Sequence, residues 1–341
     1  NKLLTPQEKK FIKDSFIKGR NVSGRKPNIL NALCVRCQSE LSAEFSCLEC
    51  IKQHIKNNFS KWTSGDKNFD LWIQYFQLRY YAKTNKVIEW VPFERFQNIE
   101  VKATGGFGII YFAKWLDGSI ISWDTYKQKF LRGRPGPFIL KSMNTKNIEN
   151  ININFYKEIL IHMVLSLESP YIVTCYGLTK EPKSGNFMMI LEYLFDGDLK
   201  TYLKNKDITL SWRTRYSILH NITSALSKMH HSNILHGDIH PGNIISSRNL
   251  WCIALALNIC NGTRPEINFK LPSDYEEIMK RCWNADISCR PSASELLKFF
   301  TTNLQKIYKN ELIIPELDDS LLITSDIDIT PKIFNTDQDS L

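Results

Sequence analysis

The chain has 341 residues, of which 43% are hydrophobic and 23% charged, and its formal net charge is +9. This composition excludes a wholly disordered protein. The longest apolar run, eight residues at 250–257, is far shorter than the roughly 18 that a membrane-spanning helix needs. We therefore expect an intracellular, cytoplasmic protein that contacts no membrane, and a nuclear location stays open.

The charge is unevenly distributed. Residues 1–62 hold 12 Lys and Arg against 5 Asp and Glu, whereas residues 311–341 hold 8 acidic residues and one Lys. Such basicity would attract phosphates, nucleic acid or an acidic partner, but a solvated surface explains it equally well. We expect nucleotide and unidentified proteins as partners, and we disfavour nucleic acid.

Apolar spacing predicts the secondary structure in chain order. Helical spacing marks 69–80, 154–166, 210–230, 250–261, 273–284 and 292–308. Alternation around a glycine turn predicts a β-hairpin within 87–115, and shorter strands are expected at 138–143, 171–178 and 187–193. Strands that come mostly before helices predict an α+β arrangement in two lobes.

The glycine turn is the first signal of chemistry. Gly105, Gly106 and Gly108, with Phe107 between them, let the backbone approach a polyphosphate closely, and Ile110 follows where an apolar residue would cover a purine. Tight hairpins also use glycine constantly, so the turn by itself favours a structural role.

A lysine and a glutamate follow this turn. Lys141 stands on an apolar strand, and Glu158 lies 17 residues later on a predicted helix. A Lys that reaches the phosphates of a nucleotide needs a carboxylate to hold its ammonium. The alternative is an ordinary surface ion pair.

Two further segments complete the pattern. Glu192 and Leu194 lie in Leu-Glu-Tyr-Leu, which we interpret as a hinge that binds the nucleotide. The loop 236–243, His-Gly-Asp-Ile-His-Pro-Gly-Asn, sets Asp238 and Asn243 five residues apart. Here the Asp can accept a hydroxyl proton, and the Asn carbonyl can hold Mg²⁺.

In order and spacing these motifs resemble a protein kinase. Residues 278–297 are similar to the C-terminal helices of the tyrosine-kinase-like group, and the double C-x-x-C module resembles the N-terminal extension of kinases expanded in arbuscular mycorrhizal fungi. The resemblance implies a two-lobed kinase fold, with ATP and Mg²⁺ as cofactors. It also implies Ser, Thr or Tyr phosphotransfer in signal transduction.

The resemblance divides the chain into five parts. They are a basic N-terminal segment (1–30), a cysteine module (31–55), a helical linker (56–92), a kinase-like domain (93–309, with a β-rich small lobe at 93–193 and a truncated helical large lobe at 194–309) and an acidic tail (310–341). We expect the tail to be disordered because it has no sustained apolar period.

The chain also departs from the family pattern. Ile139 would crowd the adenine slot, and Gly237 stands where the family has Arg. No Asp-Phe-Gly and no Ala-Pro-Glu occur, so we expect the activation segment to be deleted and Arg290 to have lost its usual partner. The chain is then either a true pseudokinase, or a truncated form that arises from splicing or from a faulty gene model. Truncation is favoured because the sequences on both sides of the missing segment still resemble the family.

Without that segment we expect weak ATP binding, Mg²⁺ held by Asn243 alone, and impaired catalysis. The alternative function is a non-catalytic, zinc-containing scaffold or adaptor. Cys34, Cys37, Cys47 and Cys50 form two C-x-x-C pairs, a set that suits a tetrahedral zinc–thiolate site of structural type. Zinc is favoured over free thiols, and an iron–sulfur or redox role is the minor alternative.

Overall fold

The computed structural model describes most of the chain between residues 33 and 309. The described residues are 33–34, 36–41, 47–84, 86–105, 108–125, 127–142, 153–205, 210–237, 239–247, 250–254, 271–284 and 286–309, without the side chains of 82, 83, 105 and 153–158. The basic segment 1–30 and the acidic tail 310–341 lie outside them.

Helices occur at both ends of the described chain. They are the α-helices α2 (Leu48–Asn58), α3 (Lys67–Thr84), α4 (Ile153–Glu168), α5 (Leu199–Lys204), α6 (Trp212–His231), α7 (Ser273–Cys282) and α8 (Ala293–Tyr308), and the 3-10 helices η2 (Phe59–Lys61), η3 (Phe93–Arg95), η4 (Pro241–Asn243) and η5 (Ile287–Cys289). In the described chain no helix has the length and apolarity needed to cross a bilayer.

Strands fill the middle of the chain. They are β1 (Glu89–Trp90), β2 (Phe96–Gly105), β3 (Gly108–Trp115), β4 (Ile120–Asp124), β5 (Lys129–Arg132), β6 (Gly136–Ser142), β7 (Cys175–Lys180), β8 (Phe187–Glu192), β9 (Gly197–Asp198), β10 (Ile244–Ser247) and β11 (Leu250–Ile253).

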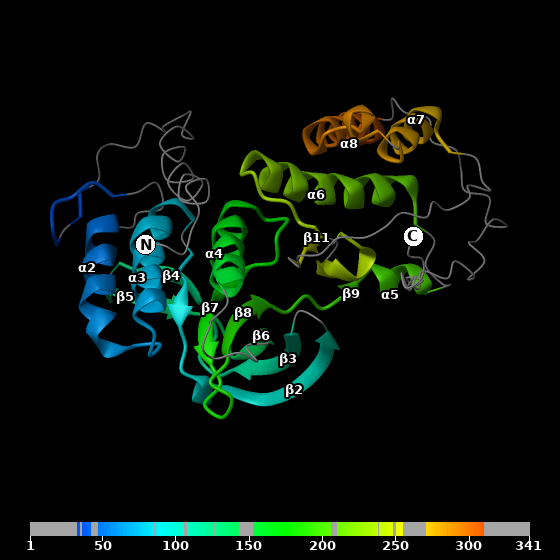
Figure 1. Cartoon of the computed structure of the whole chain (residues 1–341). Helices are drawn as coiled ribbons and strands as arrows, with labels where there is room; N and C mark the ends of the chain where they lie inside the picture. The colour runs from blue at the N-terminus through cyan, green and yellow to red at the C-terminus, as the bar shows by residue number, and fades with distance from the viewer. Residues whose placement is uncertain are drawn as a thin grey trace, which may run out of the picture.

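Six strands form the main sheet, in the order β1-β7-β8-β6-β3-β2 (Figure 1). β1 runs parallel to β7, and the other neighbours are antiparallel. β4 and β5 form a separate two-stranded sheet, and β9, β10 and β11 form a three-stranded one. The main sheet and α4 lie at one end of the molecule, and α6, α7 and α8 lie at the other (Figure 1).

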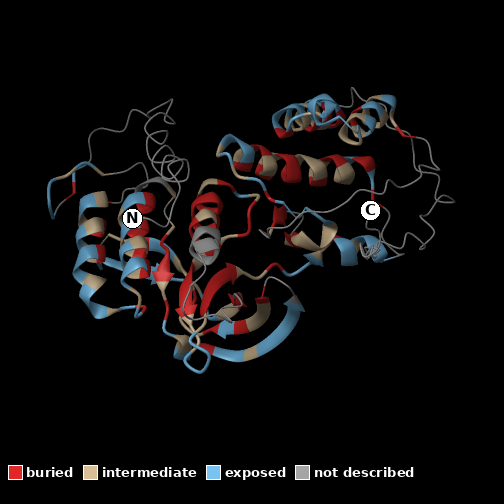
Figure 2. Ribbon diagram, in the orientation of Figure 1, coloured by how far each residue is buried: buried red, intermediate tan, exposed pale blue. Residues whose placement is uncertain are grey.

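The apolar run of β8 explains how this sheet is buried on both faces. Phe187, Met189 and Leu191 belong to the core that also contains residues of α3 and α4. The alternate residues Met188 and Ile190 belong to the core on the opposite face, with Trp115 of β3. Figure 2 shows the buried residues concentrated in β7, β8 and α4.

The helical part is built on α6 and α8. Ser211 caps α6 by accepting a hydrogen bond from the amide of Thr214 (3.2 Å), and Ser292 caps α8 in the same way from Glu295 (3.1 Å). The two helices enclose an aromatic core around the fully buried Tyr216. α7 adds Tyr275 to this core.

One predicted helix is wrong at its start. The run at 250–261 was expected to be helical, but residues 250–253 form β11, which pairs antiparallel with β10 along its whole length. Trp251, Cys252 and Ile253 are all buried. An apolar run buried on both sides has no period that separates strand from helix, so the neighbouring strand decides. Residues 255–261 lie outside the described residues.

Candidate nucleotide site and cysteine cluster

The glycine hairpin is the β2–β3 connection. Gly105 pairs with Gly108, and Gly108 has a φ of 126°, a left-handed value that favours glycine. Gly106 and Phe107 lie outside the described residues. Ile110, half-buried on β3, stands opposite Lys141 of β6 in register. The strand pairing therefore sets the predicted purine-covering residue beside the predicted phosphate-binding lysine.

Lys141 occupies the middle of the main sheet. It is buried, and on its other side it pairs with Met189 of β8. Glu158 belongs to α4, but its side chain is not among those described. The next residue, Ile159, is fully buried in the core that contains Met189. Thus α4 packs on the sheet that carries Lys141.

A buried histidine on α4 stabilises this packing. His162 is 1% exposed, and its Nε2 donates to the carbonyl oxygen of Val173 (2.8 Å). Its Nδ1 is buried without a hydrogen-bond partner among the described residues. Burial and, to a smaller extent, the charge of Lys141 lower the pKa of His162 to about 4. His162 is therefore neutral near pH 7.

The predicted hinge follows β8. The amide of Glu192 donates to the carbonyl of Thr174 (2.9 Å), and Leu194 is buried. Ile139 pairs with Leu191, and it packs against the same core as Ile245 of β10. Thus the sheet part and the helical part share one apolar cluster at the hinge.

The loop 236–243 is fixed at both ends by one residue, Ala254. His236 is buried, and its Nε2 donates to the carbonyl of Ala254 (2.9 Å). The amide of Ala254 in turn donates to the carbonyl of Asn243 (2.8 Å). Asn243 itself is half-buried at the end of η4. Asp238 lies outside the described residues.

The residue before Asp238 has an unusual backbone. Gly237 has a φ of 76°, in the left-handed region that side chains other than Asn and Asp rarely adopt. Glycine is therefore well suited to this position, where related kinases carry the Arg noted above. Arg290 is exposed, and its Nε donates to the carbonyl of Asn284 (2.7 Å), so the guanidinium is not buried without a partner.

Carboxylates are scarce around Asn243. No Asp or Glu occurs between Asp238 and Glu266 in the sequence. Asp198, paired with Ile245 through β9, accepts hydrogen bonds from the amide and hydroxyl of Thr201 (2.9 and 2.8 Å) and so caps α5. Mg²⁺ bound with nucleotide is generally held by one or two carboxylates. The sequence from Asn243 to 265 therefore supplies no carboxylate ligand for Mg²⁺.

Sequence reasoning missed three residues of this region. Ile245 and Cys252 join the shared core at the hinge, and Ala254 anchors the loop that carries Asp238. Burial raises the pKa of Cys252 to about 12, so its thiol is neutral. Ile245 lies two residues after Asn243, so it could have been considered together with the loop motif. Ala254 has a methyl side chain, and nothing in the sequence marks it as an anchor of the loop.

The four predicted zinc ligands come together. Their Sγ atoms all lie within 4.8 Å of one another, with separations of 3.3 Å for Cys37–Cys47, 3.6 Å for Cys37–Cys50 and 3.8 Å for Cys34–Cys50. Four sulfurs about 2.3 Å from a central ion would stand about 3.8 Å apart. The cluster is therefore compatible with a tetrahedral metal site.

Local structure explains how the cluster forms. Cys34 and Cys37 lie in a tight turn closed by the amide of Cys34, which donates to Ser39 (2.8 Å). Cys47 caps α2, and Cys50 lies in its first turn. Hydrogen bonds from Ser39 lower the pKa of Cys37 to about 6, whereas burial raises that of Cys50. A turn and a helix start thus present two thiols each.

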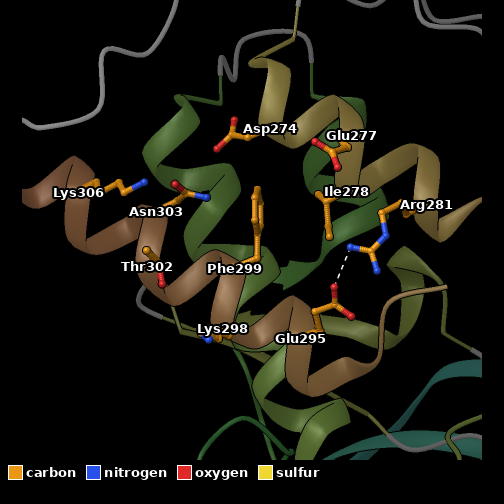
Figure 3. A pocket seen from close by; sticks show the side chains of 10 residues that line it. All are labelled: Asp274, Glu277, Ile278, Arg281, Glu295, Lys298, Phe299, Thr302, Asn303 and Lys306. Carbon is orange, nitrogen blue, oxygen red and sulfur yellow. Dashed lines mark hydrogen bonds and ion pairs between the residues drawn. The ribbon is translucent and has the colours of Figure 1, made fainter. Parts of the chain in front are cut away.

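A groove of about 390 Å³ lies elsewhere, between α7 and α8 (Figure 3). Ile278 and Phe299 supply its apolar surface, and an ion pair between Arg281 and Glu295 (2.7 Å) crosses it. It contains none of the predicted site residues and lies at the opposite end of the molecule from the glycine hairpin (Figures 1 and 3). The groove is therefore separate from the candidate nucleotide site around Lys141.

A main sheet that carries Lys141, followed by a helical part, is the two-lobed arrangement that the sequence resemblance predicts. Residues 129–261 match the family described as the protein kinase domain. With its β-sheet small lobe and helical part, the structure confirms the predicted fold class, a two-lobed protein-kinase-like fold. The match begins in β5, so the glycine hairpin precedes it.

Several curated relatives are named as kinases. The chain is 25% identical over 160 residues to a probable serine/threonine-protein kinase of Dictyostelium discoideum, 28% over 173 residues to an Aurora kinase of Eremothecium gossypii, and 30% over 148 residues to a leaf rust 10 disease-resistance locus receptor-like protein kinase-like protein of Arabidopsis thaliana. The aligned parts cover 47%, 47% and 42% of this chain and 15%, 40% and 18% of those relatives.

Proposed function

We propose that the chain is a kinase-domain protein of signal transduction that binds ATP weakly and is impaired in phosphotransfer. Support for nucleotide binding comes from the register that sets Ile110 beside Lys141 and from the hinge at Glu192 and Leu194. Gly105, Gly106, Phe107 and Gly108 would approach the phosphates, and Glu158 would orient Lys141. Ile139, part of the apolar cluster at the hinge, would limit the space for a purine.

The surroundings of Asn243 carry the proposal of impaired transfer. β11 ends beside Asn243 and is followed by Ala254, whose backbone is already engaged with both ends of the loop. Asp238 can still accept a proton, but phosphoryl transfer depends mainly on positioning and charge neutralisation. Loss of several kcal/mol of that stabilisation lowers the rate by about 10³-fold or more.

The test is radiolabel transfer from ATP to a generic protein substrate. We expect no incorporation above that of Asp238→Ala, with or without Mg²⁺, from a preparation whose melting temperature still rises with ATP. The ATP response shows that the absence of transfer is not caused by misfolding. Robust incorporation that Asp238→Ala abolishes would refute the proposal and imply a metal-binding carboxylate elsewhere in the chain.

We also propose that Cys34, Cys37, Cys47 and Cys50 hold one structural zinc ion, which would suit a scaffold or adaptor role. The sulfur separations near those of a tetrahedral site support it. Zinc contents near zero in protein purified under reducing conditions, with all four thiols open to alkylation, would contradict it.

Reduced thiols favour an intracellular, cytoplasmic compartment. Membership of the tyrosine-kinase-like group and kinship with the fungal kinases are further proposals.

A further inference from the structure

Helix α2 connects the cysteine cluster to the β4–β5 hairpin. Its first turn carries Cys50, and its buried residues Ile51 and Ile55 belong to a core shared with Trp123 of β4. Phe130 of β5 packs against the same core. Figure 1 shows α2 and α3 side by side at the end of the molecule where β4 and β5 lie. The helix therefore has the cluster at one end and the hairpin on its apolar face.

Aromatic contacts join this helix to both strands of the hairpin. The ring of His54 lies edge-on to Trp123 (4.9 Å between centroids) and to Phe130 (5.5 Å). The turn that carries the first two cysteines also reaches the hairpin, because Arg36 donates to the side chain of Gln128 (3.4 Å). The cysteine module thus touches β4, β5 and the turn between them.

The hairpin has few other supports. It has two strands, and neither pairs with the main sheet. A two-stranded hairpin is marginally stable unless it packs against another element. Its second support is Arg132 of β5, which forms an ion pair with the buried Glu89 and lies over the ring of Trp115 (5.6 Å). The face made by Trp123 and Phe130 depends on α2 and on Tyr81 of α3.

Helix α2 has 11 residues, a length that is marginal for an isolated helix. Packing on α3 and the hairpin supports it, and the cysteine cluster at its start offers a second point of attachment. We propose that the metal ion of the cysteine cluster secures this attachment, so that metal loading holds α2 against β4–β5 and sets the local stability of the hairpin. This proposal rests on the zinc binding proposed above.

Hydrogen–deuterium exchange of the full chain in reducing buffer tests the proposal. We compare zinc-loaded protein, protein stripped by a chelator, and stripped protein after addition of Zn²⁺. Exchange in peptides that cover β4 and β5 should rise by about tenfold on stripping and return with Zn²⁺. Peptides from β8, buried in the main sheet, should change by less than about twofold. Unchanged exchange in β4 and β5 after verified metal loss would overturn the proposal.

Variants separate metal binding from docking. Cys37→Ser should lower the metal content and raise exchange in the hairpin. Because Cys37 lies outside α2, this variant leaves the sequence of the helix unchanged. Cys289→Ser, at an exposed cysteine of η5, is the matched control and should change neither. Ile55→Ala should keep the metal and still raise hairpin exchange.

The outcomes distinguish the two proposals. Protein without metal under reducing conditions would remove both the zinc site and this inference. If Ile55→Ala retains the metal and its hairpin exchanges at the wild-type rate, the zinc site stands and the docking proposal is overturned.

Discussion

The sheet part and the helical part of the kinase-like fold differ in how their described residues are arranged. The main sheet has a continuous ladder of six strands and cores on both faces. In the helical part, the described residues form the small sheet β11-β10-β9 and an aromatic core around Tyr216 of α6. Nucleotide-positioning residues belong mainly to the first part, and the groups expected to neutralise transferred charge would follow Asn243.

This difference separates binding from catalysis. Lys141 is placed on β6 by its register with two neighbouring strands. Asp238 and Asn243 belong to a loop whose ends are tied to Ala254, a residue without functional groups on its side chain. Under the proposed function, the sheet would keep a nucleotide-binding geometry while the loop would lack a carboxylate ligand for the metal.

The largest expected effect is on the free energy of unfolding, and it compares a core residue of the sheet part with one of the helical part. Trp115→Ala should lower the free energy of unfolding by about 3–5 kcal/mol, because Trp115 is fully buried between two sheet neighbours. Trp251→Ala should cost less, about 2–3 kcal/mol, because β11 is an edge strand whose surroundings can collapse. Urea unfolding followed by circular dichroism measures both. Equal losses would contradict the contrast.

A smaller effect concerns pH and the helix that packs on the sheet. The pKa of His162 is lowered to about 4 in the folded state, from an ordinary value near 6.5. Folding therefore favours the neutral form of His162. The contribution of this residue to the free energy of unfolding is complete above about pH 6.5 and is lost as the pH falls toward 4. The loss amounts to about 2–3 kcal/mol.

His162→Gln keeps a donor toward the carbonyl of Val173 but does not titrate. The variant should therefore lack this part of the acid sensitivity, measured as urea midpoints between pH 7.5 and 4.5. Parallel pH profiles for the variant and the wild type would show that His162 is not the group responsible.

Local patterns predicted much of the fold. Apolar residues at 69, 72, 73, 76 and 80 predicted a helix at 69–80, and the structure has α3 at Lys67–Thr84. The run at 250–253 was misassigned because its conformation is decided by pairing with β10. Periodicity within a single segment cannot contain that information.

The candidate sites divide in the same way. The two C-x-x-C pairs are local, and the structure brings their four sulfurs together. The link between His236 and Ala254 joins residues 18 positions apart, and one of them is an alanine, so no motif marks it. The docking of α2 on the hairpin was equally invisible, because Ile55 and Trp123 are ordinary apolar residues until the fold brings them into one core.

The smallest expected effect concerns nucleotide affinity. If Lys141 contacts phosphate, Lys141→Met should weaken ATP binding by about tenfold, which is about 1.4 kcal/mol. Lys141 is buried, so its replacement by Met also changes the stability of the protein without nucleotide. The quantity to compare is therefore the rise in melting temperature that ATP causes, and not the melting temperature itself. Lys114→Met, at an exposed position of the neighbouring strand β3, is the matched control and should respond to ATP like the wild type. Because no Asp or Glu follows Asn243 before Glu266 in the sequence, Mg²⁺ should change the affinity of the wild type by less than about threefold. An equal ATP response in both variants would argue against a site that depends on Lys141, and a strong Mg²⁺ requirement would argue against the proposed contrast between an intact sheet and an incomplete metal site.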